Sequence, residues 1–349
     1  MNISDPRGES VPSFVAPAAR LLNDARDTVF VWLGLRCCAL AALGVGLFFL
    51  PVAVLPYAAP LYWLLLFGGL QDRYTLMLHC TSHRPLFKKP FRALNNVIPW
   101  FLGPFFGQTP NSYFAHHMGM HHREENLAAD LSSTMRFRRD RLDHWLRYYL
   151  RFMVAGLLEL ELYFYRRKQW KLFRRVFVGE VGYFLALAAL LWAAPAAACI
   201  VFVVPFVAIR TAMMMGNWAQ HSLIKAETPE NPYHASITCI NTRYNRRCFN
   251  DGYHVLHHVK PACHWTEHPA EFERALAEYG RQDAVVFDGI DFFGVWACLM
   301  LRRWSRLADH FVVLEGAPAR TRDEIVELLK ERVQPVAQPL AVAAVVAAE

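Results

Sequence analysis

Two long stretches of the chain carry no charged residue. One runs from Cys37 to Gln71 and the other from Val181 to Ile209. Prolines interrupt both stretches, and with its flanks each is long enough for two membrane crossings at about 20 residues per crossing. The pattern predicts four membrane-spanning helices in two hairpins, at about Val29–Phe49 with Val54–Leu78 and at about Val176–Trp192 with Ala196–Met215.

The composition agrees with a membrane protein. The chain has 349 residues, and 54% of them are hydrophobic, which is more than a soluble domain of this length normally carries. The alternative, a large soluble protein with buried helices, is disfavoured by the charge-free stretches. We therefore expect an all-α integral membrane fold. Its predicted parts are an N-terminal segment (1–27), a membrane and metal domain (28–270), C-terminal cytoplasmic or interfacial helices (271–334, with an amphipathic helix near 320–333) and a low-complexity tail (335–349).

The distribution of Lys and Arg predicts the orientation in the membrane. The short turns near 51–56 and 193–197 carry neither, whereas the segment between the hairpins is rich in both and includes RRKQWKLFRR at 166–175. Because positive charge stays on the cytoplasmic side, we expect both termini and a helical cap on the hairpins to be cytoplasmic. The net charge of +7 then reflects topology and contact with anionic head groups, and it does not indicate nucleic-acid binding.

A histidine cluster stands late in the chain, in NDGYHVLHHVKP at 250–261. On a helix with about 100° per residue, His254, His257 and His258 share one face of roughly 100° of arc. Neutral imidazole is the commonest side-chain metal ligand. This face is therefore a candidate metal-binding surface, provided that other parts of the chain supply partners.

Other histidines gather at the predicted cytoplasmic ends of the spans. They stand in LHCTSHRP at 78–85, in NSYFAHHMGMHHREEN at 111–126 and in MGNWAQHSLI at 215–224. His79 and His83 are one helical turn apart, and so are Asn217 and His221. Histidines scattered through a core would not concentrate in this way, so the pattern predicts metal binding.

The residue types also indicate which metal. Structural zinc sites use four ligands and favour Cys together with His, and no paired cysteines accompany these histidines. The number of histidines exceeds the need of one ion and suits two ions of iron type. Soluble di-iron bundles use Glu-x-x-His pairs, which this chain lacks, so a site made of neutral imidazoles is the membrane alternative.

The order of the motifs resembles that of the membrane fatty-acid desaturase and hydroxylase superfamily. H-x-x-x-H, H-x-x-x-H-H, N-x-x-x-H and H-x-x-H-H follow one another around the two hairpins, over about residues 55–265. The resemblance implies two irons bound on the cytoplasmic side of a four-helix membrane domain. It assigns His79 and His83 to the first box, His117, His121 and His122 to the second, and His254, His257 and His258 to the last. It makes His221 an extra ligand and Asn217 the residue that holds an iron-bound water.

The second box departs from the usual spacing. On a regular helix His117, His121 and His122 would spread over about 140° of arc, which is wider than the last box. An additional histidine, His116, precedes them. Either the helix is irregular there or His116 replaces one of the three.

The resemblance implies an oxygen-dependent desaturase that introduces a double bond into a fatty acyl chain, with O2 as co-substrate. The alternative within enzymes is a di-iron lipid or carotenoid hydroxylase or ketolase. From another class, a membrane metal-binding or transport protein is disfavoured, because transporters place ionisable ligands near the bilayer midplane.

Electrons must come from a separate ferredoxin or b-type cytochrome, because neither an H-P-G-G haem signature nor a G-x-G-x-x-G fingerprint is present. Basic residues near the site, such as Arg84 and Arg123, would steer an acidic donor, although the same charges serve topology. Asp130, Asp251 and Glu267 are either acids that orient the ligating imidazoles or ordinary surface acids.

Overall fold

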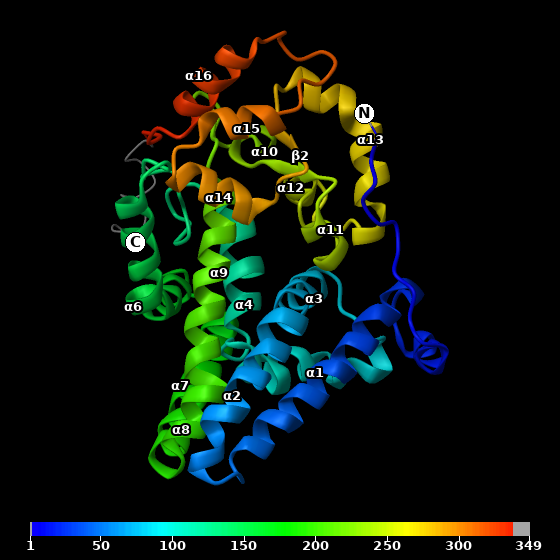
Figure 1. Ribbon diagram of the computed structural model, residues 1–349, viewed down its shortest axis with the longest axis vertical. Helices are drawn as coiled ribbons and strands as arrows, with labels where there is room; N and C mark the ends of the chain where they lie inside the picture. The colour runs from blue at the N-terminus through cyan, green and yellow to red at the C-terminus, as the bar shows by residue number, and fades with distance from the viewer. Residues whose placement is uncertain (1, 338–349) are drawn as a thin grey trace. The chain divides into compact units, whose positions relative to one another are not determined.

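The computed structural model describes residues 2–337 and is mostly helical, as the sequence predicts (Figure 1). Two short strands, β1 (Thr238–Ile240) and β2 (Val286–Asp288), pair in parallel and depart slightly from the all-α prediction. The chain divides into two compact units. Unit 1 comprises the described parts of Met1–Arg7, Met120–Leu160 and Ala212–Glu349, and unit 2 comprises Gly8–Gly119 and Glu161–Thr211.

Among residues 2–337, four helices are long and apolar enough to cross a membrane, in agreement with the four predicted spans. They cover Ala25–Leu47, Val52–His83, Trp170–Ala193 and Pro195–Gln220. The second and fourth run past their predicted ends because each helix continues beyond its last apolar residues into polar sequence. The four spans contain α1 (Thr28–Leu47), α2 (Leu55–Trp63), α3 (Gln71–His83), α7 (Trp170–Ala193), α8 (Pro195–Ala198) and α9 (Val204–Gln220). The short helix α4 (Ser112–Phe114) lies in the segment that follows the second span.

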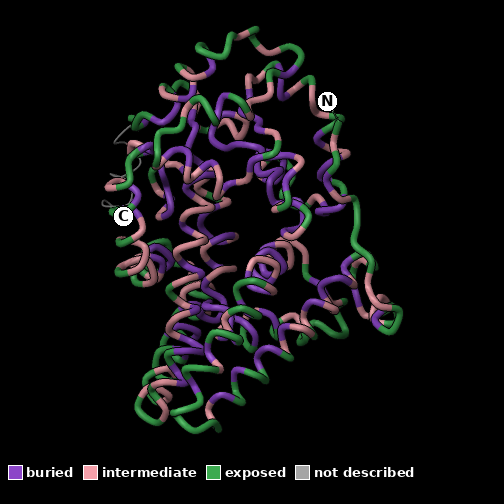
Figure 2. The backbone as a smooth tube through the Cα atoms, viewed as in Figure 1, coloured by how far each residue is buried: buried purple, intermediate pink, exposed green. Residues whose placement is uncertain are grey.

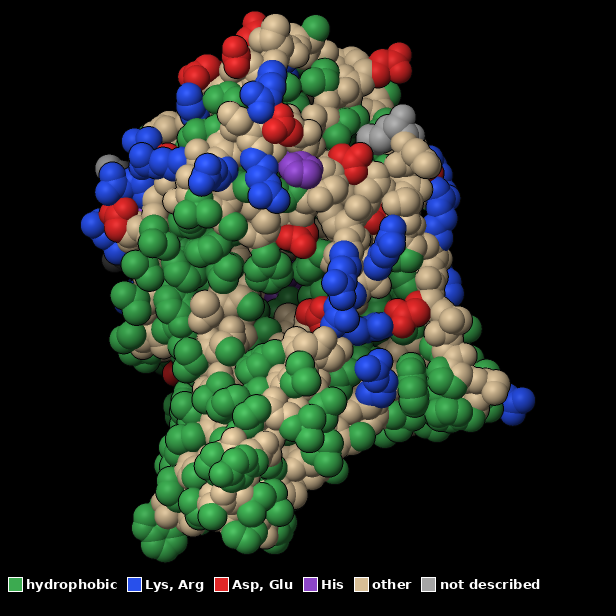
Figure 3. Space-filling view, viewed as in Figure 1, with side chains coloured by type: hydrophobic (Ala, Val, Ile, Leu, Met, Phe, Trp, Pro, Cys, Tyr) green, Lys and Arg blue, Asp and Glu red, His purple; other side chains and the backbone are tan. Residues whose placement is uncertain are grey.

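The outer faces of the spans in unit 2 are apolar. Tyr57 on α2 and Trp192 on α7 are 83% and 90% exposed, and exposed positions recur along these helices (Figure 2). Figure 3 shows hydrophobic side chains and no charged side chain over the end of unit 2 that carries α2 and α8. Large apolar surfaces of this kind are unfavourable in water and suit contact with lipid.

π-Helical turns interrupt two of the spans. Pro60 stands shortly before the π-helical segment Leu64–Leu70, and a second π-helical segment, Cys199–Val203, lies in the fourth span. Proline lacks an N–H to donate, and π turns change the backbone hydrogen-bond pattern. The Trp63 indole N–H donates to the Ile200 carbonyl oxygen at 3.0 Å. This bond satisfies a polar group that lipid could not solvate.

The connection between α3 and α4 folds back against α3 within unit 2. The Tyr74 hydroxyl donates to the carbonyl oxygen of Ile98 at 2.8 Å, and its ring stacks on Phe106 at 4.2 Å between centroids. Gly107 has φ of 71°, and a Cβ there would lie 2.6 Å from the carbonyl oxygen of Pro205. Only glycine combines this conformation with so close an approach.

Unit 1 packs short helices around the β1–β2 pair, in which Thr238 aligns with Val286 and Ile240 with Asp288. Its core includes buried residues of both strands and of α14, α15 and α16. The helix predicted near 320–333 is present as α16, whereas most of the predicted tail at 335–349 lies outside the described residues. The helices of this unit are α5 (His122–Glu124), α10 (Pro232–Ala235), α11 (Arg243–Arg247), α12 (His254–Val259), α13 (His268–Arg281), α14 (Phe292–Met300), α15 (Trp304–His310) and α16 (Arg322–Arg332), and α6 (Leu142–Arg166) begins in it.

A buried arginine joins three segments of unit 1. Arg139 is fully buried, and its guanidinium donates to backbone carbonyl oxygens that include those of Ser222 at 2.8 Å and Arg332 at 3.0 Å. Burial lowers the pKa of Arg139 to about 9, against the raising effect of Asp140. The carbonyl bonds offset the desolvation of this charge, and they hold the chain that follows α9 against the end of α16.

Candidate metal centre

Unit 2 brings three of the predicted ligands together. His79 and His83 lie one turn apart on α3, and His117 joins them from the π-helical segment Ala115–His121. The Nε2 atoms of His83 and His117 are 2.8 Å apart, and the donor nitrogens of all three lie within 4.8 Å of one another. Metal–nitrogen distances near 2.1 Å, as found for zinc, place two nitrogens of one ion roughly 3 Å apart. The spacing therefore fits shared ligation.

The irregular spacing of the second box has a local explanation. Ala115–His121 is a π-helical segment, so the helix is irregular here, as the first of the two alternatives posed by the sequence expects. A π turn is wider than an α turn, which brings residues five apart, such as His117 and His122, closer to one face. His117 is the member of the adjacent pair that meets His79 and His83, with ring centroids 4.6 and 4.9 Å away.

Unit 1 gathers a second group from three separate segments. His121 comes from the end of the π-helical segment, His221 follows α9, and His254 and His258 come from α12. Their donor nitrogens lie within 4.8 Å of one another. The Nε2 atom of His254 is 3.2 Å from those of both His221 and His258. Four imidazoles thus converge on one point within a single unit.

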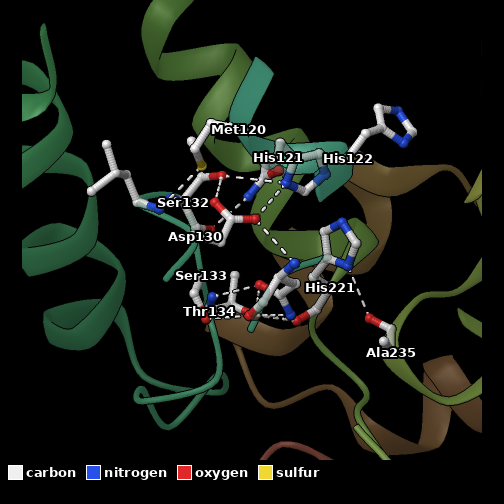
Figure 4. Close-up of polar contacts among 12 residues, drawn as sticks. Met120, His121, His122, Asp130, Ser132, Ser133, Thr134, His221 and Ala235 are labelled. Atoms are coloured by element: carbon white, nitrogen blue, oxygen red, sulfur yellow. Dashed lines mark hydrogen bonds and ion pairs between the residues drawn. The ribbon is translucent and has the colours of Figure 1, made fainter. Parts of the chain in front are cut away.

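Two of these imidazoles, those of His121 and His221, are oriented by contacts at their Nδ1 atoms (Figure 4). The Nδ1 atom of His121 lies 2.6 Å from Oδ2 of Asp130, and Nδ1 of His221 lies 2.9 Å from the carbonyl oxygen of Ala235. Asp130 is itself buried and accepts from the backbone N–H of Asn126 and from Ser132. An acceptor on Nδ1 fixes the tautomer that leaves Nε2 for a metal, an arrangement common among metal-binding histidines.

Burial keeps His221 and His258 of this second group in the form that binds metal. The pKa of His221 is lowered to about 3, mainly by desolvation and further by His121, with the bond to Ala235 acting in the opposite direction. Burial also lowers the pKa of His258 well below its usual value. Both imidazoles are therefore neutral at physiological pH, as ligation requires.

Three further predicted residues, His122, His257 and Asn217, lie beside the second group in unit 1, whereas His116 belongs to unit 2. The Nε2 atoms of His122 and His257 are 2.9 Å apart. The Asn217 amide nitrogen donates to the Tyr148 hydroxyl at 2.6 Å and to the Ser132 carbonyl oxygen at 3.2 Å. These two bonds fix the amide and leave its oxygen as the acceptor.

Of the acids considered from the sequence, Asp130 contacts a ligand candidate, whereas Asp251 binds Gln220 and Tyr244. The sequence left open whether Asp130 orients a ligating imidazole or is an ordinary surface acid. It gave no indication of Tyr148 or of the Ala235 carbonyl. Ala235 lies 14 positions after His221, and Tyr148 lies 69 positions before Asn217, so neither spacing gives a periodic signal. The donor set of both groups consists of imidazoles, without Cys or carboxylate. It fits iron as well as other borderline metals.

Comparison with known protein families identifies a match. The family model described as fatty acid desaturase matches residues 55–289, which is more than half of the chain and includes every residue of both histidine groups. No curated protein and no solved structure matches the chain significantly. The match and the convergent histidines agree, and the chain belongs to the fatty acid desaturase family.

Proposed function

We propose that the protein is an integral membrane, oxygen-dependent lipid desaturase with two bound irons. The observation that carries this proposal is the convergence of the predicted histidines into compact imidazole groups in a chain of this family. His79, His83 and His117 would ligate one ion, and His121, His221, His254 and His258 the other. His122 and His257, which meet Nε2 to Nε2, would complete the ligand set.

The residues of the chain have separate tasks in this proposal. Bound iron would supply the activation of dioxygen that removal of hydrogen from an unactivated methylene group needs. Asp130 and the Ala235 carbonyl hold two imidazoles in the ligating tautomer. Asn217 holds a water through its amide oxygen, and the burial of the groups excludes bulk water.

A fatty acyl chain is the substrate that the apolar spans suit, and an external ferredoxin or b-type cytochrome is the electron donor. From the Lys and Arg distribution we propose that the histidine groups and both termini are cytoplasmic. A tag inserted at Ala194, in the turn between α7 and α8, should then be labelled only from the opposite side of the membrane. Labelling from the cytoplasm would invert this topology.

Lipid mass spectrometry of a deletion strain against a complemented strain tests the activity. We expect complementation to restore a lipid two mass units lighter than its saturated precursor, and purified protein to consume O2 with that lipid. A product with an added oxygen would instead support the hydroxylase or ketolase alternative. Tight metal binding without O2 consumption or any lipid product would point to a metal-binding or transport protein.

A further inference from the structure

Helix α6 carries apolar side chains on two faces within unit 1. Trp145 and Tyr148 are buried in a core cluster with Met214 and Trp218. A second row of large apolar side chains, spaced four residues apart, is between 41% and 86% exposed. This row, the α6 stripe, consists of Leu142, Leu146, Leu150, Val154 and Leu158. A contiguous exposed patch of this kind normally marks a surface that something else covers.

The α6 stripe is outside the four membrane spans. The helix has 25 residues, which is enough to cross a bilayer, but charged residues interrupt it. Arg147 lies 3.6 Å from Asp143, and Arg151 lies 2.8 Å from Glu159. A long helix with one exposed apolar face and charged residues beside it suits a position in the plane of the lipid–water interface. The aliphatic parts of its arginines follow the apolar surface while their charges reach water.

A basic cavity of about 860 Å³ lies at the turn between α14 and α15, also in unit 1. Four cations and one acid line it: Arg302, Arg303, Arg306 and Lys330 with Asp309. Asp309 is paired with Arg322 at 2.7 Å, and Lys330 with Glu327 at 2.7 Å. Apolar residues that include Ile290 and Val326 complete the lining. This combination suits a ligand with both an anionic group and an apolar part.

The cavity lies near the N-terminal end of the stripe. Arg302 of the cavity lies 3.6 Å from Oδ2 of Asp140, two residues before α6 begins. Leu301, between α14 and the cavity arginines, is 68% exposed. Figure 3 shows hydrophobic side chains over α6 and α14, with Lys and Arg side chains gathered beside them. An apolar surface bordered by positive charge is complementary to a membrane that contains anionic lipids.

We propose that unit 1 rests on the membrane through the α6 stripe, and that the basic cavity binds the phosphate head group of an anionic phospholipid. The acyl chains of that lipid contact the stripe and Leu301. This surface is separate from the histidine groups, so the inference holds whether or not the protein is a desaturase.

Spin-label accessibility tests the stripe in the full-length protein, reconstituted in nanodiscs that contain phosphatidylglycerol. Labels at Leu150→Cys and Val154→Cys should collide more with O2 than with a water-soluble nickel chelate. Their relative accessibility to the two reagents should match that of a label at Leu61→Cys on α2, which serves as the lipid-exposed control. It should differ from that of a label at Asp323→Cys on α16, which serves as the water-exposed control. Accessibility like that of the water control would overturn the proposal. Protection from both reagents, with spin–spin broadening, would also overturn it, because a second copy of the chain would then cover the stripe.

Lipid titration followed by native mass spectrometry tests the cavity. The wild-type protein should bind phosphatidylglycerol more tightly than phosphatidylcholine. Arg303→Gln/Arg306→Gln should weaken the phosphatidylglycerol affinity by about fivefold per arginine removed. Arg274→Gln/Arg281→Gln removes equal charge from α13, outside the cavity, and should leave the affinity within twofold. Equal losses in the two double variants, or no preference for the anionic lipid in the wild type, would contradict the head-group site.

Discussion

The two histidine groups are assembled in different ways. In unit 2, His79 and His83 share a face because they stand one turn apart on α3. In unit 1, His121, His221 and the α12 pair come from distant segments, and acceptors such as Asp130 orient their rings. The pair on α3 follows from local spacing and is joined by one distant residue, His117, whereas the group in unit 1 joins three distant segments and depends on the tertiary fold. We call the group in unit 2, which is built on the α3 pair, the short-range arrangement, and the group in unit 1 the long-range arrangement.

Removing one ligand from each group has the largest expected effect. We expect His83→Ala in unit 2 and His254→Ala in unit 1 each to abolish lipid desaturation and to lower the iron content by about one ion per chain, because each group loses a ligand that no neighbour replaces. Metal analysis and product mass spectrometry measure both results. His310→Ala, which removes a histidine bonded to the Asp288 carbonyl, is the control and should retain the iron. Full iron retention in both ligand variants would end the di-iron assignment.

The short-range arrangement is the one that a sequence reveals. The spans were predictable because a charge-free run long enough to cross a bilayer is typical of a membrane-spanning helix. The ligand candidates were predictable because histidines at helical spacing stand out. The second and fourth helices extend past the predicted ends of their spans, since α3 and α9 continue as helices after their apolar sequence stops.

The long-range arrangement could not be read from the sequence. Asp130 lies nine positions after His121, and a turn with left-handed residues at Glu125 and Asn126 brings it back. The acceptor for His221 is the backbone carbonyl of Ala235. Every residue has a backbone carbonyl, so the residue type does not predict this contact. The π-helical segment was predictable only as an irregularity, because the spacing of the second box does not fit a regular helix.

Asn217→Ala should separate metal binding from activity. The Asn217 amide nitrogen is held by Tyr148 and Ser132, so its oxygen is fixed for a water. We expect the variant to keep most of its iron and to lose most of its activity, and Tyr148→Phe to lose less because the bond to Ser132 remains. Iron content, product yield and melting temperature should be measured together. If iron and melting temperature fall in parallel with activity, the asparagine serves the fold of unit 1; unchanged activity would make the N-x-x-x-H match a coincidence.

Asp130→Asn tests the long-range arrangement directly. Loss of the carboxylate weakens the bond that orients His121, and such changes typically cost about 10–100-fold in metal affinity or activity. Iron affinity can be measured by competition with a chelator. Asp143→Asn removes an exposed acid at the start of α6 and provides the matched charge control. An affinity equal to that of the control would show that the position of His121 does not depend on Asp130.

The smallest expected effect is that of His116→Ala, which sharpens the description of the short-range group. His116 and His117 are adjacent, and the sequence left open which of them ligates. The structure brings His117 within 2.8 Å of His83, Nε2 to Nε2, and the group that His79 and His83 form does not include His116. We therefore expect His116→Ala to retain iron and activity within about twofold of the parent, as substitutions outside a site usually do. His117→Ala, the matched variant one position on, should lose iron as severely as His83→Ala. The reverse ranking of the two variants would mean that the π-helical segment turns His116 toward the metal, and the ligand set of unit 2 would have to be reassigned.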